Sequence, residues 1–189
     1  MAMSILSRAL TYDDLKRERE TRDERLELIE GEIIVTPSPS LMHQIVAHRL
    51  DVLLDRAIVE SGLGLVIGAP FDVYLDAQNV PQPDLMVVLW DREQVLGSAR
   101  LESAPSLAIE IISPSSATKD RVTKRDLYAR YGVPEYWLVD PEAETVPVFS
   151  DPQAGRYRAK LTVSDVAVSA TIPGLSADLK ALFAPVPGL

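Results

Sequence analysis

The stretch Leu107-Ala108-Ile109-Glu110-Ile111-Ile112 has the length and apolar content of a buried β-strand, yet it carries a carboxylate at Glu110. Side chains alternate along a strand, so Glu110 faces away from its two isoleucine neighbours. The run at 83–89, Pro-Asp-Leu-Met-Val-Val-Leu, opens with a second carboxylate, Asp84. A buried carboxylate without a partner is costly, so both acids require a counter-charge or a metal ion. If the two strands are neighbours, Asp84 and Glu110 meet at one site.

The segment after Glu110 predicts a strand-helix-strand unit. A break at 113–116 is followed by a helix over 119–131, which Gly132 and Pro134 end, and by a strand over 135–140. The length of this connection suits a right-handed crossover between parallel strands.

Lys124 lies on the apolar stripe of the predicted helix, one turn before Leu127 and Tyr128. A lysine on an inward face needs a reason, although its stem can be buried while the ammonium reaches out. A salt bridge with Asp120, four residues earlier, is the ordinary explanation.

The rest of the chain alternates helical and strand-like patterns. His43 lies in the first turn of a helix that Ser40 caps; a histidine there is more often a surface or hydrogen-bonded residue than a ligand. The expected elements are a helix from Thr11, two strands around Glu30-Gly31 within 26–35, a helix from about 41 to 60, strands over 63–67 and 71–75, a short helix and loop over 91–104, an antiparallel pair at 145–149 and 156–163, and a helix over 177–183.

Composition sets limits on the class of protein. The chain has 189 residues, 47% apolar and 25% charged, which suits a single globular domain with a core at about 11–183. There is no cysteine, so any metal is held by carboxylates, carbonyls, water or one of two histidines. Such oxygen-rich ligands favour Mg²⁺, Mn²⁺ or Ca²⁺ over zinc.

Charge gives a mixed message about partners. The net charge of −9 argues mildly against nucleic acid, because phosphate binding relies on a positive surface. Locally, however, Arg121, Lys124, Arg125 and Arg130 fall within ten residues. No segment approaches the length of a membrane span, and the N-terminus has no clear signal pattern, so we expect a cytoplasmic protein with no membrane partner.

The order of these features resembles the PD-(D/E)XK nuclease superfamily, and more closely the Uma-type family of restriction-endonuclease-like proteins. Single motifs here are weak, whereas the ordered set is specific. The resembling stretches are Glu27 to Glu32, His43, Pro83-Asp84-Leu85, Ile109 to Ser115, Lys124 to Tyr128, and Gly132-Val133-Pro134-Glu135-Tyr136-Trp137-Leu138-Val139-Asp140-Pro141.

The resemblance implies an α/β (α+β) fold, a mixed β-sheet flanked by helices, to which the antiparallel C-terminal extension is added. It implies that Asp84 and Glu110, with the Ile111 carbonyl, ligate Mg²⁺ or Mn²⁺, and that Glu32 is an additional acid. The superfamily's usual lysine lies two residues after the glutamate, where this chain has Ile112. The resemblance implies that this lysine has moved to the following helix, which points to Lys124.

The expected function is metal-dependent endonucleolytic hydrolysis of phosphodiester bonds in nucleic acid, with DNA the favoured substrate. Arg121 and Arg125 are candidates for phosphate contacts, since arginine matches phosphate geometry, and His43 is grouped with them. Two alternatives stay open: a catalytically inactive module of the same fold that binds nucleic acid or protein, and a purely structural network of carboxylates with Lys124 and Arg121. The apolar edge strands over 145–163 also predict a homodimer.

Overall fold

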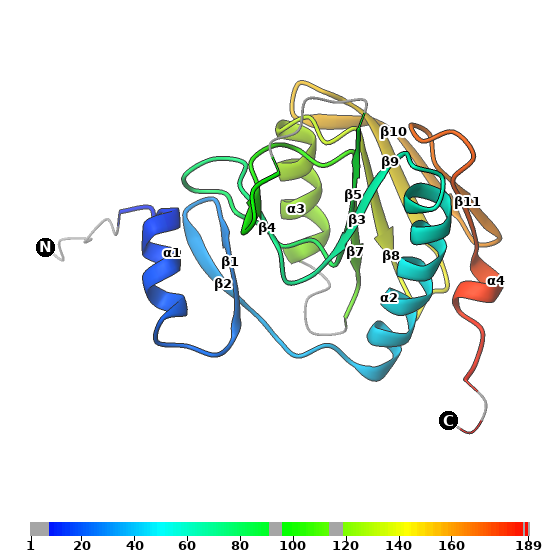
Figure 1. Ribbon diagram of the computed structural model, residues 1–189, viewed down its shortest axis with the longest axis horizontal. Coiled ribbons are helices and arrows are strands. Elements are labelled where there is room, and N and C mark those ends of the chain that lie inside the picture. The colour runs from blue at the N-terminus through cyan, green and yellow to red at the C-terminus, as the bar shows by residue number, and fades with distance from the viewer. Residues whose placement is uncertain (1–7, 91–95, 114–118, 187, 189) are drawn as a thin grey trace, which may run out of the picture.

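A six-stranded mixed sheet forms the centre of the protein in a computed structural model, which describes residues 8–90, 96–113, 119–186 and 188, with the backbone alone at 119–121. In spatial order its strands are β10 (Arg156–Val163), β9 (Val146–Gln153), β8 (Glu135–Val139), β7 (Leu107–Ile111), β5 (Leu85–Leu89) and β3 (Gly64–Gly68). Helices α2 (Leu41–Leu54) and α3 (Lys119–Arg130) cover opposite faces of this sheet (Figure 1).

Smaller elements surround the sheet. No helix within the described ranges is long and apolar enough to cross a membrane. The remaining elements are α1 (Tyr12–Arg19), the hairpin β1 (Arg25–Ile29) and β2 (Glu32–Thr36), a π-helical turn (Asp55–Val59), β4 (Asp72–Val73) with β6 (Arg100–Leu101), β11 (Val166–Val168) with β12 (Ser176–Asp178), and α4 (Leu179–Leu182).

The predicted crossover is confirmed. Strands β7 and β8 pair in parallel, with Leu107 opposite Glu135, and α3 connects them. Strand β5 lies on the other side of β7 and runs antiparallel to it, with Leu85 opposite Ile109. Strand β5, which directly follows Asp84, and strand β7, which carries Glu110, are therefore neighbours, as the sequence predicts.

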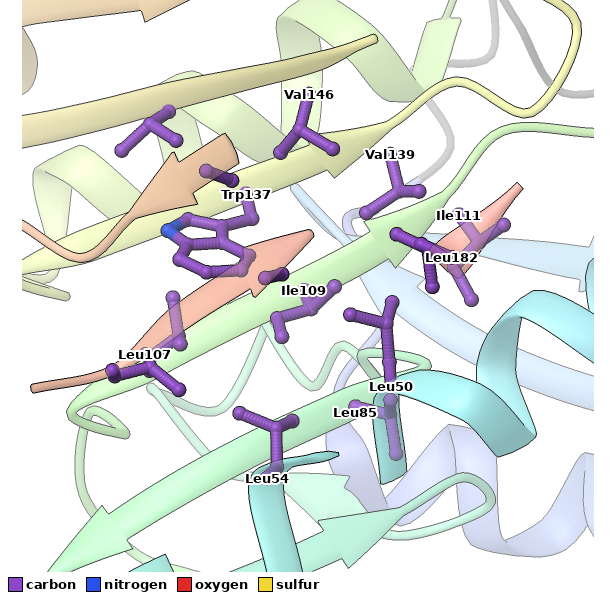
Figure 2. Packing of buried hydrophobic residues seen from close by; sticks show 14 of the residues in the cluster. Leu50, Leu54, Leu85, Leu107, Ile109, Ile111, Trp137, Val139, Val146 and Leu182 are labelled. Atoms are coloured by element: carbon purple, nitrogen blue, oxygen red, sulfur yellow. The ribbon is translucent and has the colours of Figure 1, made fainter. Parts of the chain in front are cut away.

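Alternation along β7 separates the main core from the polar site. Ile109 and Ile111 pack on the α2 face, in a cluster that includes Trp137 and Leu50 (Figure 2). Glu110 lies between them in sequence and projects to the α3 face, where Tyr128 of α3 contacts it. Burial of the isoleucines thus fixes the direction in which the carboxylate points.

The hairpin β1–β2 turns as expected at Glu30-Gly31. Both residues have positive φ, 52° and 76°, which is the backbone of the tight hairpin turns that match strand twist. A Cβ on Gly31 would lie 2.6 Å from the Cβ of Ala9, so the N-terminal segment also requires glycine here. The hairpin packs beside α1 on the α3 side of the sheet (Figure 1).

Three expected elements differ from the structure. The helix predicted over 177–183 is shortened to α4, because the residues before it form strand β12. The strand predicted at 71–75 is reduced to β4, which leaves the main sheet and pairs in parallel with β6. A short helix and a loop were expected over 91–104, but the structure has strand β6 within this range. Residues 91–95 lie outside the described part. Val73 and Leu101 pack together with Met86 and Val88 of β5, and this burial between distant segments is not visible as a local pattern.

Candidate active site

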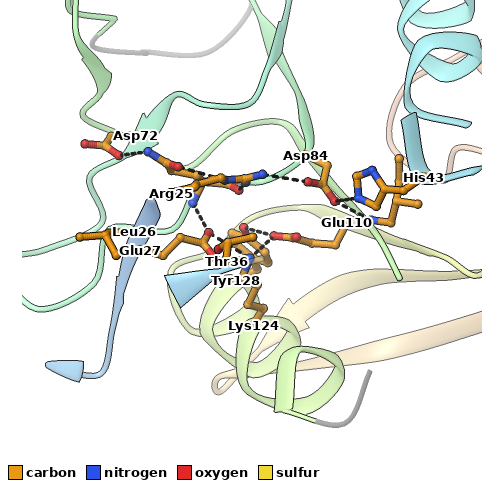
Figure 3. Close-up of polar contacts among 12 residues, drawn as sticks. Arg25, Leu26, Glu27, Thr36, His43, Asp72, Asp84, Glu110, Lys124 and Tyr128 are labelled. Carbon is orange, nitrogen blue, oxygen red and sulfur yellow. Dashed lines mark hydrogen bonds and ion pairs between the residues drawn. The ribbon is translucent and has the colours of Figure 1, made fainter. Parts of the chain in front are cut away.

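Asp84 stands directly before β5, and the β5–β7 register continued by one residue places it opposite Glu110. Its Oδ2 accepts a hydrogen bond from the Ile111 backbone N–H at 2.9 Å and lies 3.1 Å from His43 Nε2. Its Oδ1 accepts from Arg25 Nη1 at 3.3 Å. Asp84 is thus held from both sides, by the hairpin and by α2 (Figure 3).

These contacts keep Asp84 ionised. Burial by itself would raise the pKa of Asp84, but the hydrogen bonds from His43 and the Ile111 N–H, with the charge of Lys124, hold that pKa below its ordinary value. The ionised carboxylate is the form that binds a cation.

Glu110 lies on the α3 face with only 7% of its surface exposed. Its Oε1 accepts hydrogen bonds from Lys124 Nζ at 3.0 Å and from the Tyr128 hydroxyl at 2.9 Å. Burial raises the pKa of Glu110; Lys124 opposes the shift, and the negative charges of Asp84 and Glu27 add to it. Glu110 therefore carries its charge at a cost that a bound cation would remove.

Lys124 bridges two glutamates. Besides Glu110, its Nζ lies 2.9 Å from Oε2 and 3.0 Å from Oε1 of Glu27 in β1. Burial by itself would lower the pKa of Lys124, but Glu110 and Glu27 raise it above its ordinary value, so the residue is an ammonium. The apolar stripe of the helix predicted that Lys124 faces inward, and the structure agrees, because Lys124 is only 4% exposed.

Glu27 accepts two further hydrogen bonds besides its contacts with Lys124. The Gln82 backbone N–H donates to its Oε1 at 2.5 Å, and the Thr36 hydroxyl donates to its Oε2 at 3.2 Å. Gln82 also accepts hydrogen bonds from Arg25 through its side-chain and backbone oxygens. The hairpin and the segment that leads into β5 are therefore tied together around the acids.

The structure brings together Asp84, Glu110 and Lys124, but places Glu32 elsewhere. Glu32 begins β2 and is exposed, whereas Glu27 of the paired strand reaches the lysine. The hairpin thus places Glu27, and not the predicted Glu32, beside Lys124. The Ile111 N–H contacts Asp84; the metal-ligand role of the Ile111 carbonyl stays a prediction.

The candidates for nucleic-acid contact have different surroundings. His43 is not on an open surface, because its ring lies against Asp84 and its side chain is 11% exposed. Arg125 is one-third exposed, donates from Nε to Asp126 at 2.7 Å and lies over the Phe149 ring. The side chain of Arg121 lies outside the described part of the chain.

Residues of this network that were not predicted as site residues include Arg25, Glu27, Gln82 and Tyr128. Glu27 carried a usable signal, since it interrupts an apolar run between Leu26 and Leu28 just as Glu110 interrupts its own strand. The others carried none, because arginine, glutamine and tyrosine are common in surface strands and amphipathic helices.

The fit to a metal ion rests on Asp84 and Glu110. In the ranges that the structure describes, no group of three or more Asp, Glu or His side chains is arranged to hold a metal. Mg²⁺, however, is commonly bound through one or two carboxylates, with waters and substrate phosphates completing its coordination. Two carboxylates on adjacent strands, one of them with its pKa raised by burial, suit that mode of binding.

Replacing Tyr128 with phenylalanine is expected to lower the free energy of unfolding by about 1.5–3 kcal/mol, because a buried hydrogen bond to a charged group is lost. Urea denaturation measures the change. Tyr157→Phe is the control, since that hydroxyl donates to the neutral Val133 carbonyl, at 2.9 Å, and its loss costs about 0.5–1.5 kcal/mol. Equal losses in the two variants would contradict a charged acceptor at Glu110.

The mixed sheet, its parallel crossover and the acids at adjacent strands define a restriction-endonuclease-like fold. A family model described as "Putative restriction endonuclease" matches residues 10–180. The chain therefore belongs to this family, called Uma2.

Two relatives accompany this assignment. The chain is 26% identical over 141 residues to the "Uncharacterized protein sll1609" of Synechocystis sp. (strain ATCC 27184 / PCC 6803 / Kazusa), which covers 74% of this chain and 80% of the relative. The present chain superposes with a TM-score of 0.74 on the crystal structure of "a putative nuclease belonging to DUF820" from Anabaena variabilis ATCC 29413. That match covers 92% of this chain and 97% of the other at 22% identity, and it establishes the fold.

Proposed function

We propose that the protein is a metal-dependent endonuclease that hydrolyses phosphodiester bonds in nucleic acid, with DNA as the favoured substrate. The observation that carries the proposal is the convergence of Asp84, Glu110 and Lys124 from three separate elements on one buried site. The family to which the chain belongs supports the nuclease class.

Each residue has a role that follows from its surroundings. Asp84 and Glu110, with the Ile111 carbonyl, would hold Mg²⁺ or Mn²⁺. Such an ion, when bound, supplies a water of lowered pKa and polarises the phosphate. Lys124 keeps its ammonium charge beside Glu110, where it stabilises negative charge developing on the phosphate oxygens.

The chemical balance of the reaction is simple. The oxygen of a water molecule forms a bond to phosphorus as the bond from phosphorus to one ester oxygen breaks. One proton of the water leaves to solvent, and the departing ester oxygen takes up a proton. The carboxylates and the lysine are already fixed by their contacts, so they would orient the reacting groups with little reorganisation.

Nuclease assays with and without metal test the proposal. Purified protein is expected to cleave plasmid DNA in Mg²⁺ or Mn²⁺ and to lose this activity when a chelator is added, since the carboxylates then have no ion to hold. Parallel assays on single-stranded DNA and RNA identify the substrate. Cleavage that persists unchanged in chelator would contradict a metal-dependent mechanism.

One observation favours the main alternative, a non-catalytic module of the same fold. Both carboxylates already have cationic partners, Arg25 for Asp84 and Lys124 for Glu110. A protein that binds DNA at equal strength with and without Mn²⁺, and cleaves nothing, would fit that alternative.

The predicted contacts and oligomeric state belong to the same proposal. Arg125, and Arg121 near it on α3, would contact phosphates beside the site. Strand β10 forms one edge of the sheet, with Leu161 62% exposed, and would pair with a second copy of the chain. Light scattering tests the homodimer, and a monomer at all concentrations would refute it.

A further inference from the structure

We propose that Glu27 is a positioning residue, which holds Lys124 in place when Asp84 and Glu110 bind a divalent cation. This inference rests on the proposed function and adds a residue that the comparison with the superfamily does not supply. The buried ammonium group of Lys124 contacts two glutamates, Glu27 and Glu110 (Figure 3).

The contacts of Lys124 are unequally divided. An ammonium group has three hydrogens to donate. Its Nζ lies within 3.0 Å of both carboxylate oxygens of Glu27, but contacts Glu110 through Oε1 alone. Glu27 can therefore retain Lys124 if Glu110 turns its charge toward another cation.

Binding of a cation at Glu110 makes a second counter-ion necessary. Lys124 is 4% exposed, so water cannot replace a lost carboxylate partner. A buried charge that loses its partner is strongly destabilised, and a nearby divalent cation would repel the ammonium as well. Without Glu27, both effects would make the binding of the divalent cation weaker.

Glu27 is built to stay in place during such a change. The Gln82 N–H and the Thr36 hydroxyl hold one oxygen each, and Glu27 is 2% exposed. Gln82 is two residues from Asp84, so the same segment fixes both the counter-ion of Lys124 and a carboxylate of the metal pair. Lys124 Nζ contacts both Glu27 and Glu110, so the three side chains lie side by side.

Glu32 provides a matched control on the same hairpin. It differs from Glu27 in being exposed. It is also the residue that the sequence resemblance predicted as an additional acid of the site. Neutralising Glu32 removes the same formal charge from the protein without touching Lys124.

The test is calorimetric titration of the full chain with Mn²⁺ at fixed pH and ionic strength. Glu27→Gln is expected to weaken Mn²⁺ binding by about 10–100-fold, the usual effect of losing a group that orients a metal site. Glu32→Gln is expected to bind as the wild type does. Equal binding by wild type and Glu27→Gln would overturn the inference, while binding absent from the wild type would overturn the metal-dependent function itself.

A double-mutant cycle separates positioning through Lys124 from a general effect of charge. In a Lys124→Met background there is no ammonium left to retain, so adding Glu27→Gln is expected to change Mn²⁺ affinity far less than it does in the wild type. An equal loss in both backgrounds would show that Glu27 acts only by its charge, and would overturn the inference.

Folding of the variants is checked by circular dichroism. Gln keeps the size of Glu27 and an oxygen for the Gln82 N–H, so the single variant is expected to fold. If it does not, the neutral pair Glu27→Gln/Lys124→Met takes its place. Mn²⁺ binding equal to that of Lys124→Met then supports the inference, and binding about tenfold weaker or more would overturn it.

Discussion

Replacing Glu110 with glutamine is expected to lower the rate of metal-dependent phosphodiester cleavage by at least about 10³-fold and to abolish Mn²⁺ binding. The amide is a poor ligand for a hard cation and leaves Asp84 as the single carboxylate of the pair. Initial rates on plasmid DNA and calorimetry on the same preparation measure the two effects.

The fold is expected to survive this change. Burial and the charges of Asp84 and Glu27 raise the pKa of Glu110, so a neutral side chain relieves repulsion. Lys124 keeps Glu27 as its partner. Loss of cleavage without loss of stability would therefore assign Glu110 to function rather than to structure.

Glu135 is the matched control for a buried glutamate outside the site. It is fully buried in β8 and accepts hydrogen bonds from Trp137, Ser169 and Thr171. Glu135→Gln is expected to lower stability by about 1–3 kcal/mol and to leave cleavage intact. Wild-type cleavage by Glu110→Gln would sink the proposed mechanism.

Replacing Lys124 with methionine is expected to lower the free energy of unfolding by about 3–5 kcal/mol near neutral pH and to remove cleavage. The methionine fills the space of the lysine stem but leaves Glu27 and Glu110 buried without their shared counter-ion. Urea denaturation measures the stability.

The loss should depend on pH in a defined direction. Burial raises the pKa of Glu110 and Lys124 opposes this shift. Without the ammonium, the Glu110 carboxylate therefore takes up a proton more readily in the folded state than in the unfolded chain. Groups with a raised pKa lose stability as pH increases, so the deficit of Lys124→Met should be smaller at about pH 5 than at about pH 8. Lys180→Met, at an exposed position, should change stability by less than about 0.5 kcal/mol at either pH.

Neutralising the partner should restore part of the loss. The double variant Glu27→Gln/Lys124→Met removes one of the two stranded charges and is expected to be more stable than Lys124→Met alone. If the Lys124→Met protein were as stable as the wild type, the buried ion pairs of Lys124 would contribute nothing to the free energy of folding. Some buried ion pairs are neutral in this way.

The predictable part of the site lies on regular elements. Glu110 and Lys124 could be found because each breaks a periodic apolar pattern, one of period two and the other of period 3.6. Asp84 could be found because it opens an apolar, strand-like run in which a carboxylate is unusual. The parallel crossover followed from the lengths of the segments between 107 and 140.

The unpredicted part depends on segments distant in sequence. Glu27 lies 97 residues from Lys124. The hairpin offers three acids, Glu27, Glu30 and Glu32. Glu27 interrupts an apolar run, but this local pattern does not reveal that its partner is Lys124. Arg25 reaches Asp84 across 59 residues. Such pairings follow from how the hairpin packs on the sheet, which local patterns do not encode.

By itself, the sequence determined which residues must be buried and, through alternation, the direction in which Glu110 and Lys124 face. Only the tertiary structure decided their partners: Glu27 in place of Glu32 beside Lys124, and His43 against Asp84. The physical reason is that side-chain periodicity is a local property of each strand and helix. The pairing of buried charges, in contrast, depends on the packing of whole elements, which the summed burial of apolar surface determines.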